Sequence, residues 1–499
     1  MKLSLKYMIK VVVQMEELKN SKCLNVFEFF NEMNQIPRGS GNEQAVSDWL
    51  VKFAKDRNLE VIQDEALNII IKKGGTPGYE NSAPVILQGH MDMVPEKEDG
   101  VDHDFLKDPI AFVVKDDYVY ADGTTLGADN GIAVSYGLAL LDSDSIAHPP
   151  IELLVTTSEE TGMDGAFALD PSNLEGRRLI NIDSEEEGKL LVSCAGGIGA
   201  TLILPIEWSE VPADAKAFEI RIDGLFGGHS GMEINKQRGS ANKIMGRILY
   251  DLEKTMDLAL AHLEGGSKHN AIPRSANVVI LLNAEEEKEV TAALEKWTAI
   301  LRNELQGVDD GVRVTLASHV GTIQHVFSKG VTHRLIQILS LVPAGVINMS
   351  MAIEGLVQTS SNLGVVRTEE NSITFENAIR SSVRSHKEEV AATMGIIAEV
   401  TGAHIEYSSE YPEWQYNPKS ELREIFVKAY EEVYGNKPEI SAIHAGLECG
   451  LFSEKFDGKI DLISFGPNLY DVHTPQEHMS ISSVERTWEY LKTVLGMLK

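Results

Sequence analysis

The sequence feature that most constrains the fold is a series of short, almost continuous apolar segments that alternate with longer segments of helical periodicity. The apolar segments cover residues 68–73, 83–90, 151–160 and 178–186, and each of them ends in polar residues. Strands that are buried on both faces have such a pattern, whereas half-buried strands alternate between apolar and polar residues. The pattern predicts an α/β fold whose mixed, mostly parallel sheet is covered by helices.

Helical spacing of apolar residues surrounds these segments. It occurs at 26–33 and 45–59, which are separated by a break at residues 36–39, Ile-Pro-Arg-Gly. Residues 127–142 begin as a glycine-containing loop and continue as a further helix. Helices and buried strands therefore alternate along the first 200 residues.

The middle of the chain has a different pattern. After about Pro205 we expect an inserted α+β domain of two similar halves. Its expected strands are 217–225, 276–284, 312–320, 362–370 and 372–385, and its expected helices are 240–264, 287–305, 331–344 and 388–402. The second half is expected to begin with the strand at 312–320.

The α/β pattern returns from about Tyr411, with helices expected at 420–435 and 482–498 and a strand at 461–467. A chain of 499 residues is too long for one core, because cores stop growing near about 250 to 300 residues. We therefore predict a discontinuous first domain, residues 20–208 and 409–499, and an inserted domain, residues 209–408.

Composition excludes several classes of partner. Asp and Glu number 75 against 45 Lys and Arg, which gives a formal net charge of -30. Such a charge repels phosphate backbones and anionic lipid surfaces, so we expect neither nucleic acid nor membrane partners.

The spacing of the three cysteines fits neither a disulfide framework nor a thiolate zinc cluster, which favours a reducing, cytoplasmic location. We interpret residues 1–20 as a short extension, with Met8 and Met15 as alternative starts.

Acidic residues and histidines follow the apolar strands. His90 ends the second segment and Asp92 follows it, Glu159 and Glu160 end the third, and Asp183 lies within the fourth. His473 lies in the loop after the strand at 461–467. Open α/β sheets place their ligand sites beyond the carboxyl ends of strands, so these side chains are expected to converge on one pocket.

Each of these residues has a simpler interpretation when it is taken alone. His90 and Asp92 could form a surface pair, and Asp129 could be the N-cap of the helix that follows it. Glu159 and Glu160 would point in different directions if extended, but such a pair is usually a solvated patch. Taken together, nitrogen and oxygen donors of this kind suit zinc, cobalt or manganese.

The motifs resemble those of the M20 metallopeptidases, and among them the aminoacyl-histidine dipeptidases. The resemblance extends over nearly the whole chain beyond the first twenty residues, in a specific order and spacing. It is carried by LQGHMDMVPEK, DGTTLGADNGIAV, TTSEETGMDGA, LINIDSEEEG, DGLFGGHSGMEI, HNAIPR, IHAGLECGLF and DVHTPQEHMS.

This resemblance implies two divalent metal ions, with zinc favoured over cobalt or manganese. His90 and His473 would each bind one ion, Asp129 would bridge the two, and Glu160 and Asp183 would complete the coordination spheres. Two more residues would support the reaction: Asp92 would orient His90, and Glu159 would be the general base that generates the attacking hydroxide.

The resemblance also assigns roles outside the metal ligands. His229 would stabilise the oxyanion, Asn270 would contact the substrate, and Arg380 would grip its free carboxylate, although Arg384 competes for that role. Glu448 is a candidate partner for the amino group of the substrate. The implied activity is hydrolysis of dipeptides, including Xaa-His and β-alanyl-histidine. The discontinuous first domain would be the catalytic domain, and the inserted domain would be its lid.

Three alternatives stay open from the sequence. The chain could be an aminoacylase, tripeptidase or other amidohydrolase of the same superfamily, or a peptide-binding or metal-binding protein that has kept the fold without the activity. Glu159 argues against the binding protein, because a site that only binds would not need this base. A homodimer is also possible, although the large insertion suggests that one chain completes its own site.

Overall fold

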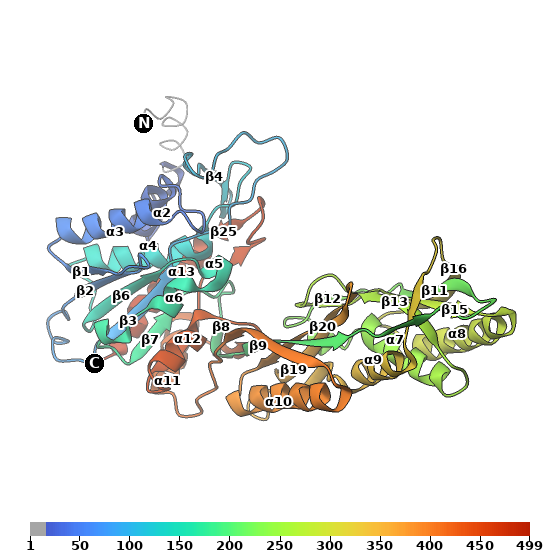
Figure 1. Ribbon diagram of the computed structural model, residues 1–499. Coiled ribbons are helices and arrows are strands. Elements are labelled where there is room, and N and C mark those ends of the chain that lie inside the picture. Colours follow the sequence, from blue (N-terminus) through green and yellow to red (C-terminus); the bar gives the residue numbers. More distant parts are fainter. Residues whose placement is uncertain (1–15) are drawn as a thin grey trace. The chain divides into compact units, whose positions relative to one another are not determined.

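The computed structural model describes residues 16–499, which form two compact units (Figure 1). The first unit contains the described residues up to Ser193 together with Tyr416–Ala442 and Glu448–Lys499. The second unit contains Cys194–Gln415 and Ile443–Leu447. The alternative starts at Met8 and Met15, and most of the expected extension, lie outside the described residues.

An eight-stranded sheet, in the order β1-β2-β6-β3-β7-β23-β8-β22, forms the centre of the first unit. Its middle strands β6, β3, β7 and β23 are parallel, whereas β1 and β2 run antiparallel at one edge. The predicted mixed sheet is confirmed. The strands are β1 (Glu60–Gln63), β2 (Ile69–Lys73), β3 (Val85–His90), β6 (Ile151–Thr156), β7 (Arg178–Asn181), β8 (Lys189–Cys194), β22 (Glu439–Ile443) and β23 (Asp461–Ser464).

Helices bury this sheet because their apolar faces share one core with its side chains. Val85 and Leu87 of β3 belong to the same buried cluster as residues of α2, α4, α11 and α13. The helices of the first unit are α2 (Leu24–Asn34), α3 (Gln44–Asp56), α4 (Ala128–Asp142), α5 (Glu159–Gly162), α6 (Asp164–Ala168), α11 (Glu421–Tyr434), α12 (Glu448–Lys455) and α13 (Ile481–Met497).

A smaller sheet of four strands also belongs to the first unit. Its order is β24-β25-β5-β4, and all its pairings are antiparallel. The strands are β4 (Phe112–Lys115), β5 (Tyr118–Ala121), β24 (Leu469–Tyr470) and β25 (His478–Ser480). The loop between β24 and β25 carries His473.

The main sheet of the second unit has the path β16-β11-β15-β13-β19-β20-β9-β21, and β18 (Gly345–Met349) pairs with β19 beside this path. The other strands are β9 (Gly196–Pro205), β11 (Lys216–Asp223), β13 (Ala259–Gly265), β15 (Ala276–Leu282), β16 (Arg313–Ser318), β19 (Val357–Thr368), β20 (Ser372–Ser381) and β21 (His404–Tyr411). The helices are α7 (Ala241–Glu253), α8 (Ala284–Glu304), α9 (Lys329–Leu341) and α10 (Arg384–Thr401).

Two similar halves make up this unit, and one is inserted into the other. The first half is β11-α7-β13-β15-α8-β16, and the second half is β9-α9-β19-β20-α10-β21. Both have a β-α-β-β-α-β order, and they meet where β13 pairs with β19. The first half therefore enters the second between its first strand and its first helix.

The expected division into halves was wrong in one place. Strand β16 was expected to begin the second half but closes the first, because it pairs with β11. Strand β9, which lies within the range predicted for the first domain, pairs with β20 and β21 in the second unit. The boundaries proposed at 208/209 and 408/409 stay a prediction.

The helix expected at 240–264 was too long. Helix α7 ends at Glu253, and Ala259–Gly265 forms β13, which pairs with both β15 and β19. The apolar residues of this segment are compatible with either a helix or a strand. The segment is a strand because its backbone pairs with two neighbouring strands. Within residues 16–499, no helix is long and apolar enough to cross a membrane.

Candidate metal centre

The carboxyl ends of the parallel strands bring the expected ligands of the first unit together. His90 is the last residue of β3, Glu159 and Glu160 follow β6, and Asp183 follows β7. The loop after β23 leads through β24 to His473. The His90 side chain is only 1% exposed, which excludes a surface pair of His90 with Asp92.

Asp129 lies between the two histidines. Its Oδ1 is 3.1 Å from His90 Nε2, and its Oδ2 is 3.1 Å from His473 Nε2. His90 Nε2 also lies 3.5 Å from Asp183 Oδ1, and His473 Nε2 lies 3.0 Å from Glu160 Oε2. Two clusters of ligand atoms, each able to hold one ion, are thus joined by one carboxylate.

The backbone around Asp129 explains how this carboxylate reaches both histidines. Gly127 has a left-handed conformation at φ 68, and Asp129 has non-helical dihedral angles within the first turn of α4. No side-chain bond caps this helix, so Asp129 is not its N-cap. The neighbouring Asn130 accepts a hydrogen bond from the His90 backbone N–H and donates one to the Ile182 carbonyl, which ties α4 to the ends of β3 and β7.

Asp92 lies behind His90. Its Oδ1 is 3.3 Å from His90 Nδ1, as the alternation of an extended chain predicts. The carboxylate also accepts hydrogen bonds from Ser40 Oγ and from the backbone N–H groups of Glu159 and Glu160. Asp92 therefore fixes the orientation of the His90 ring and the start of α5 together.

Glu159 and Glu160 are not extended. Ser158 has a left-handed φ of 53, after which the two residues begin the short helix α5. Glu160 lies against His473, whereas no side-chain hydrogen bond or ion pair joins Glu159 to another described residue. One of its carboxylate oxygens lies in a further potential ligand cluster with His90 and Glu160.

The charges of this cluster fit divalent cations. Burial raises the pKa of Asp183 to about 6, that of Glu448 to about 7 and that of Glu159 well above its ordinary value. Hydrogen bonding to Asp129 and Glu160 raises the pKa of His473 to about 11. Loss of water contacts is the main cause of the raised carboxylate pKa values, and neighbouring negative charges add to it, so bound cations would stabilise the ionised carboxylates. The buried Glu160 Oε1, which has no hydrogen-bond partner, is a further free donor atom for a metal.

Two residues of the centre were missed in the sequence. The Glu477 carboxylate accepts hydrogen bonds from four consecutive backbone N–H groups, at residues 126–129. The buried Arg38 guanidinium donates to the carbonyls of Met91, Asp92 and Gly127. Glu477 lies in the motif DVHTPQEHMS, and Arg38 lies in the break at residues 36–39. Neither position could be assigned a role, because sequence spacing does not report hydrogen bonds to distant backbone groups.

In the second unit, pairing of β12 (Gly228–His229) with β14 (Ala271–Ile272) brings His229 and Asn270 into neighbouring positions. The Ser230 N–H donates to the Asn270 carbonyl. His229 Nδ1 accepts hydrogen bonds from the N–H groups of Gly231 and Met232, at 3.2 and 3.0 Å. Since Nδ1 is an acceptor, the proton of the neutral ring is on Nε2, which can donate.

Arg380 lies near His229 in the same unit. A Cβ atom on Gly231 would lie 3.1 Å from His229 Cε1, 3.3 Å from Arg380 Nε and 2.6 Å from the His444 carbonyl oxygen. Arg380 Nη1 donates to the Tyr411 hydroxyl, and its buried Nε has no partner. Arg384, the competing arginine, is already paired with Glu413.

Glu448 is fully buried at the start of α12 in the first unit. Its Oε2 accepts hydrogen bonds from Gln88 Nε2, at 2.5 Å, and from Thr156 Oγ1, at 2.9 Å. Its Oε1 is buried without a partner. The predicted contact of Glu448 with a substrate amino group stays a prediction.

Comparison with known proteins identifies the family. Residues 86–496 match the model of peptidase family M20/M25/M40. The chain belongs to this family. It is 37% identical to the cytosol non-specific dipeptidase of Escherichia coli (strain K12), over 96% of this chain and 99% of that protein.

Solved structures agree with this M20 assignment. The crystal structure of aminoacylhistidine dipeptidase from Vibrio alginolyticus has a TM-score of 0.92 at 40% identity, covering 96% of this chain and 98% of that one. Aminopeptidase PepT from Bacillus cereus, at 16% identity and a TM-score of 0.55 over 95% of this chain and 98% of that one, shares the fold. This M20 peptidase is therefore an enzyme that hydrolyses peptides.

Proposed function

We propose that this M20 peptidase is a dipeptidase that uses two metal ions and hydrolyses dipeptides, including Xaa-His and β-alanyl-histidine substrates. The bridging position of Asp129 between His90 and His473 carries the proposal. The names of the relatives from Escherichia coli and Vibrio alginolyticus support the substrate class. The first of these names also supports a cytosolic location.

We assign one ion to His90 and Asp183, the other to His473 and Glu160, and Asp129 to both. The donors are imidazole nitrogens and carboxylate oxygens, which favours zinc, with cobalt or manganese as substitutes. When bound, such ions polarise a scissile carbonyl and make a nearby water more acidic. Asp92 holds the ring of His90 in the orientation that this role requires.

Glu159 is assigned as the general base. Its carboxylate lies beside the proposed ligands without a side-chain hydrogen bond of its own, so it is free to take a proton from the attacking water and return it to the leaving amine. Its pKa, which burial raises well above the ordinary value, would fall once cations neutralise the surrounding carboxylates.

Replacement of Glu159 tests this function. Glu159→Gln is expected to keep two metal ions per chain and to lose at least about a hundredfold in kcat on a free dipeptide. Glu65→Gln makes the same chemical change at an exposed position of the first unit and is the control. If Glu159→Gln retains near wild-type turnover, Glu159 is not the base.

His229 is assigned to the oxyanion and Arg380 to the substrate carboxylate. Because His229 Nδ1 accepts hydrogen bonds, the ring carries its N–H at Nε2. A donor of this kind typically stabilises the transition state by about 3 to 4 kcal/mol. The unpartnered Nε of Arg380 supports its choice over Arg384. Asn270, beside His229, is assigned to the substrate as well.

His229 belongs to the first half of the second unit and Arg380 to its second half, and their closeness around Gly231 supports the proposal that no partner subunit is needed to bring these two residues together. A mixture of inactive His229→Ala and inactive Glu159→Gln chains should then stay inactive. Recovery of activity would mean that subunits share the site. Rates on free dipeptides, tripeptides and N-acylated amino acids would separate a dipeptidase from the other amidohydrolases, and only the free dipeptides are expected to be cleaved rapidly.

A further inference from the structure

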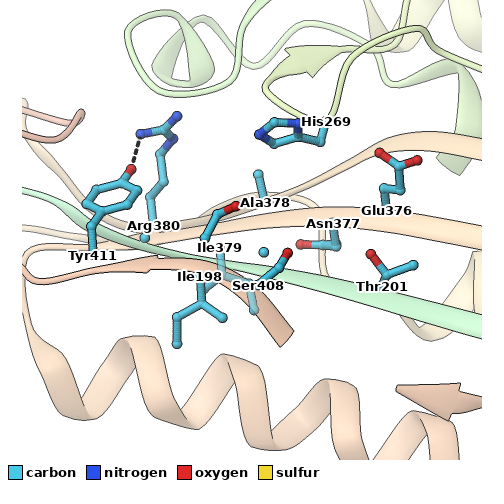
Figure 2. Close-up of a pocket in the computed structure, with 13 residues that line it drawn as sticks. Ile198, Thr201, His269, Glu376, Asn377, Ala378, Ile379, Arg380, Ser408 and Tyr411 are labelled. Carbon is cyan, nitrogen blue, oxygen red and sulfur yellow. Dashed lines mark hydrogen bonds between the residues drawn. The ribbon is translucent and has the colours of Figure 1, made fainter. Parts of the chain in front are cut away.

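A hollow of about 130 Å³ lies on one face of the second unit's sheet, where β9, β20 and β21 run side by side (Figure 2). Residues of β20 alternate between the two faces of the sheet. Phe375 and Ile379 are in the buried core, whereas Glu376 and Arg380 line the hollow. The hollow is therefore on the face opposite to the core that packs against the helices.

The floor of the hollow is made of small residues. Gly199 of β9 is paired with Ala378 of β20 on one side and with Ser408 of β21 on the other, and Gly197 is paired with Arg380. A Cβ atom on Gly197 would lie 2.5 Å from the Tyr411 ring, and one on Gly199 would lie 2.8 Å from Ser408 Oγ. Side chains at these two positions would fill the space or displace its walls.

The two ends of the hollow have opposite charge. Arg380 and Glu376 are on either side of Ala378 along β20, with His269 above Ala378 (Figure 2). The Tyr411 hydroxyl accepts a hydrogen bond from Nη1 of Arg380, but the buried Nε of Arg380 has no partner. Among the described residues, no ion pair satisfies the Glu376 carboxylate. One end of the hollow thus offers a free guanidinium N–H, and the other offers a carboxylate that no described residue pairs with.

The spacing fits one amino acid. Alternate residues of a strand are about 6.6 to 6.8 Å apart, so the Cα atoms of Glu376 and Arg380 are separated by roughly 13 Å. Both side chains rise from the same face of β20 (Figure 2), so their charged groups are about as far apart as their Cα atoms. Two hydrogen-bonded contacts of about 3 Å each then leave roughly 7 Å between the two charged groups of a bound molecule. That length matches the distance from the carboxylate to the charged end of an extended lysine or arginine.

We propose that this hollow receives the side chain of the C-terminal residue of the substrate, and that Glu376 selects residues with a cationic or imidazole side chain. The inference rests on the proposed dipeptidase function and on the grip of Arg380 on the carboxylate. Thr201, which is paired with Glu376, and His269 add polar contacts along the same walls.

The test measures kcat/KM of the wild type and of variants on three dipeptides, Ala-Lys, Ala-Glu and Ala-Leu. The values for Ala-Lys and Ala-Glu are each divided by the value for Ala-Leu. Glu376→Gln is expected to lower the Ala-Lys to Ala-Leu ratio about tenfold, because it removes one charge-assisted hydrogen bond. Glu376→Lys should lower it further and raise Ala-Glu relative to Ala-Leu. Glu289→Lys, on the exposed side of α8, makes the same charge change away from the hollow and should leave all ratios unchanged.

Thermal unfolding and metal content of each variant show whether it is folded and loaded. If the wild type cleaves all three dipeptides and Glu376→Lys changes no ratio by more than twofold, the selectivity inference is overturned while the proposed function stands. If the wild type cleaves no free dipeptide, the proposed function fails, and the inference fails with it.

Discussion

The carboxylate of Glu477 and the backbone of Asp129 are joined by a hydrogen bond, the last of four that Glu477 accepts from consecutive N–H groups. Glu477 also lies four residues after His473 in the chain. One buried side chain thus links the loop of the bridging carboxylate to the loop of a proposed metal ligand. We infer that Glu477 positions both loops.

Replacement of this carboxylate should weaken metal binding. Glu477→Gln keeps the volume but turns an NH₂ group towards backbone N–H groups, which disrupts two of the four hydrogen bonds. Metal affinity, measured by competition with a chelator, is expected to fall by about ten- to a hundredfold. Glu96→Gln, at an exposed position, should bind metal like the wild type. Equal affinities in both variants would contradict the positioning role.

A methyl group at Gly231 should impair catalysis without loss of metal. Its Cβ would lie 2.6 Å from the His444 carbonyl and close to both His229 and Arg380, so one of these groups must move. Gly231→Ala is expected to lower kcat/KM by at least about a hundredfold, since small displacements of catalytic groups have such effects. In Gly330→Ala the added Cβ would meet only Ser328 Oγ, at 3.9 Å, and activity should be unchanged. A normal kcat/KM in Gly231→Ala would contradict the prediction, because it would mean that displacement of His229 or Arg380 does not affect catalysis.

Metal binding should release protons at pH 7. In the metal-free site the pKa of His473 is raised to about 11 and that of Glu448 to about 7, so His473 is protonated and Glu448 partly so. A cation requires neutral imidazole and favours ionised carboxylates, which lowers these pKa values. Calorimetric titration of the metal-free protein with zinc, in buffers of different ionisation enthalpy, should show release of about one proton or more. His473→Gln should release about one fewer, and heats independent of the buffer would refute the expectation.

His444 should make the stability of the protein depend on pH. Burial, with a further contribution from Arg380, lowers the pKa of His444 to about 3, whereas the unfolded value is about 6.5. Between these values only the unfolded state binds the proton, so the free energy of unfolding falls as the pH drops below about 6.5. At pH 5 the expected loss is about 2 kcal/mol.

Urea unfolding of metal-free protein at pH 7 and pH 5 measures this effect. His444 Nε2 lies 2.7 Å from Ser360 Oγ, and a glutamine can retain a hydrogen bond to that hydroxyl without titrating. The wild type should lose about 2 kcal/mol more than His444→Gln between the two pH values. Equal losses would show that His444 does not titrate between folded and unfolded states.

Local patterns in the sequence were enough to predict many of the strands and helices of the first unit. The apolar segments that end at His90 and at Glu160 form buried parallel strands, β3 and β6, because hydrophobic runs bounded by polar residues encode such strands locally. The convergence of these strand ends was also predictable, since parallel strands bring their carboxyl ends to one edge. The family resemblance is confirmed, whereas the individual ligand assignments stay predictions.

Only the tertiary structure decided which distant groups meet. The segment Ala259–Gly265 is a strand because β15 and β19 pair with it, and no local periodicity reports that pairing. Likewise, Glu477 reaches residues 126–129 and Gly231 packs against His444 across long stretches of chain. Short-range patterns determine the type and burial of an element, and long-range register and backbone hydrogen bonds determine its neighbours. The sequence by itself therefore determined the donors of the proposed metal centre, and the tertiary structure alone decided what holds and surrounds them.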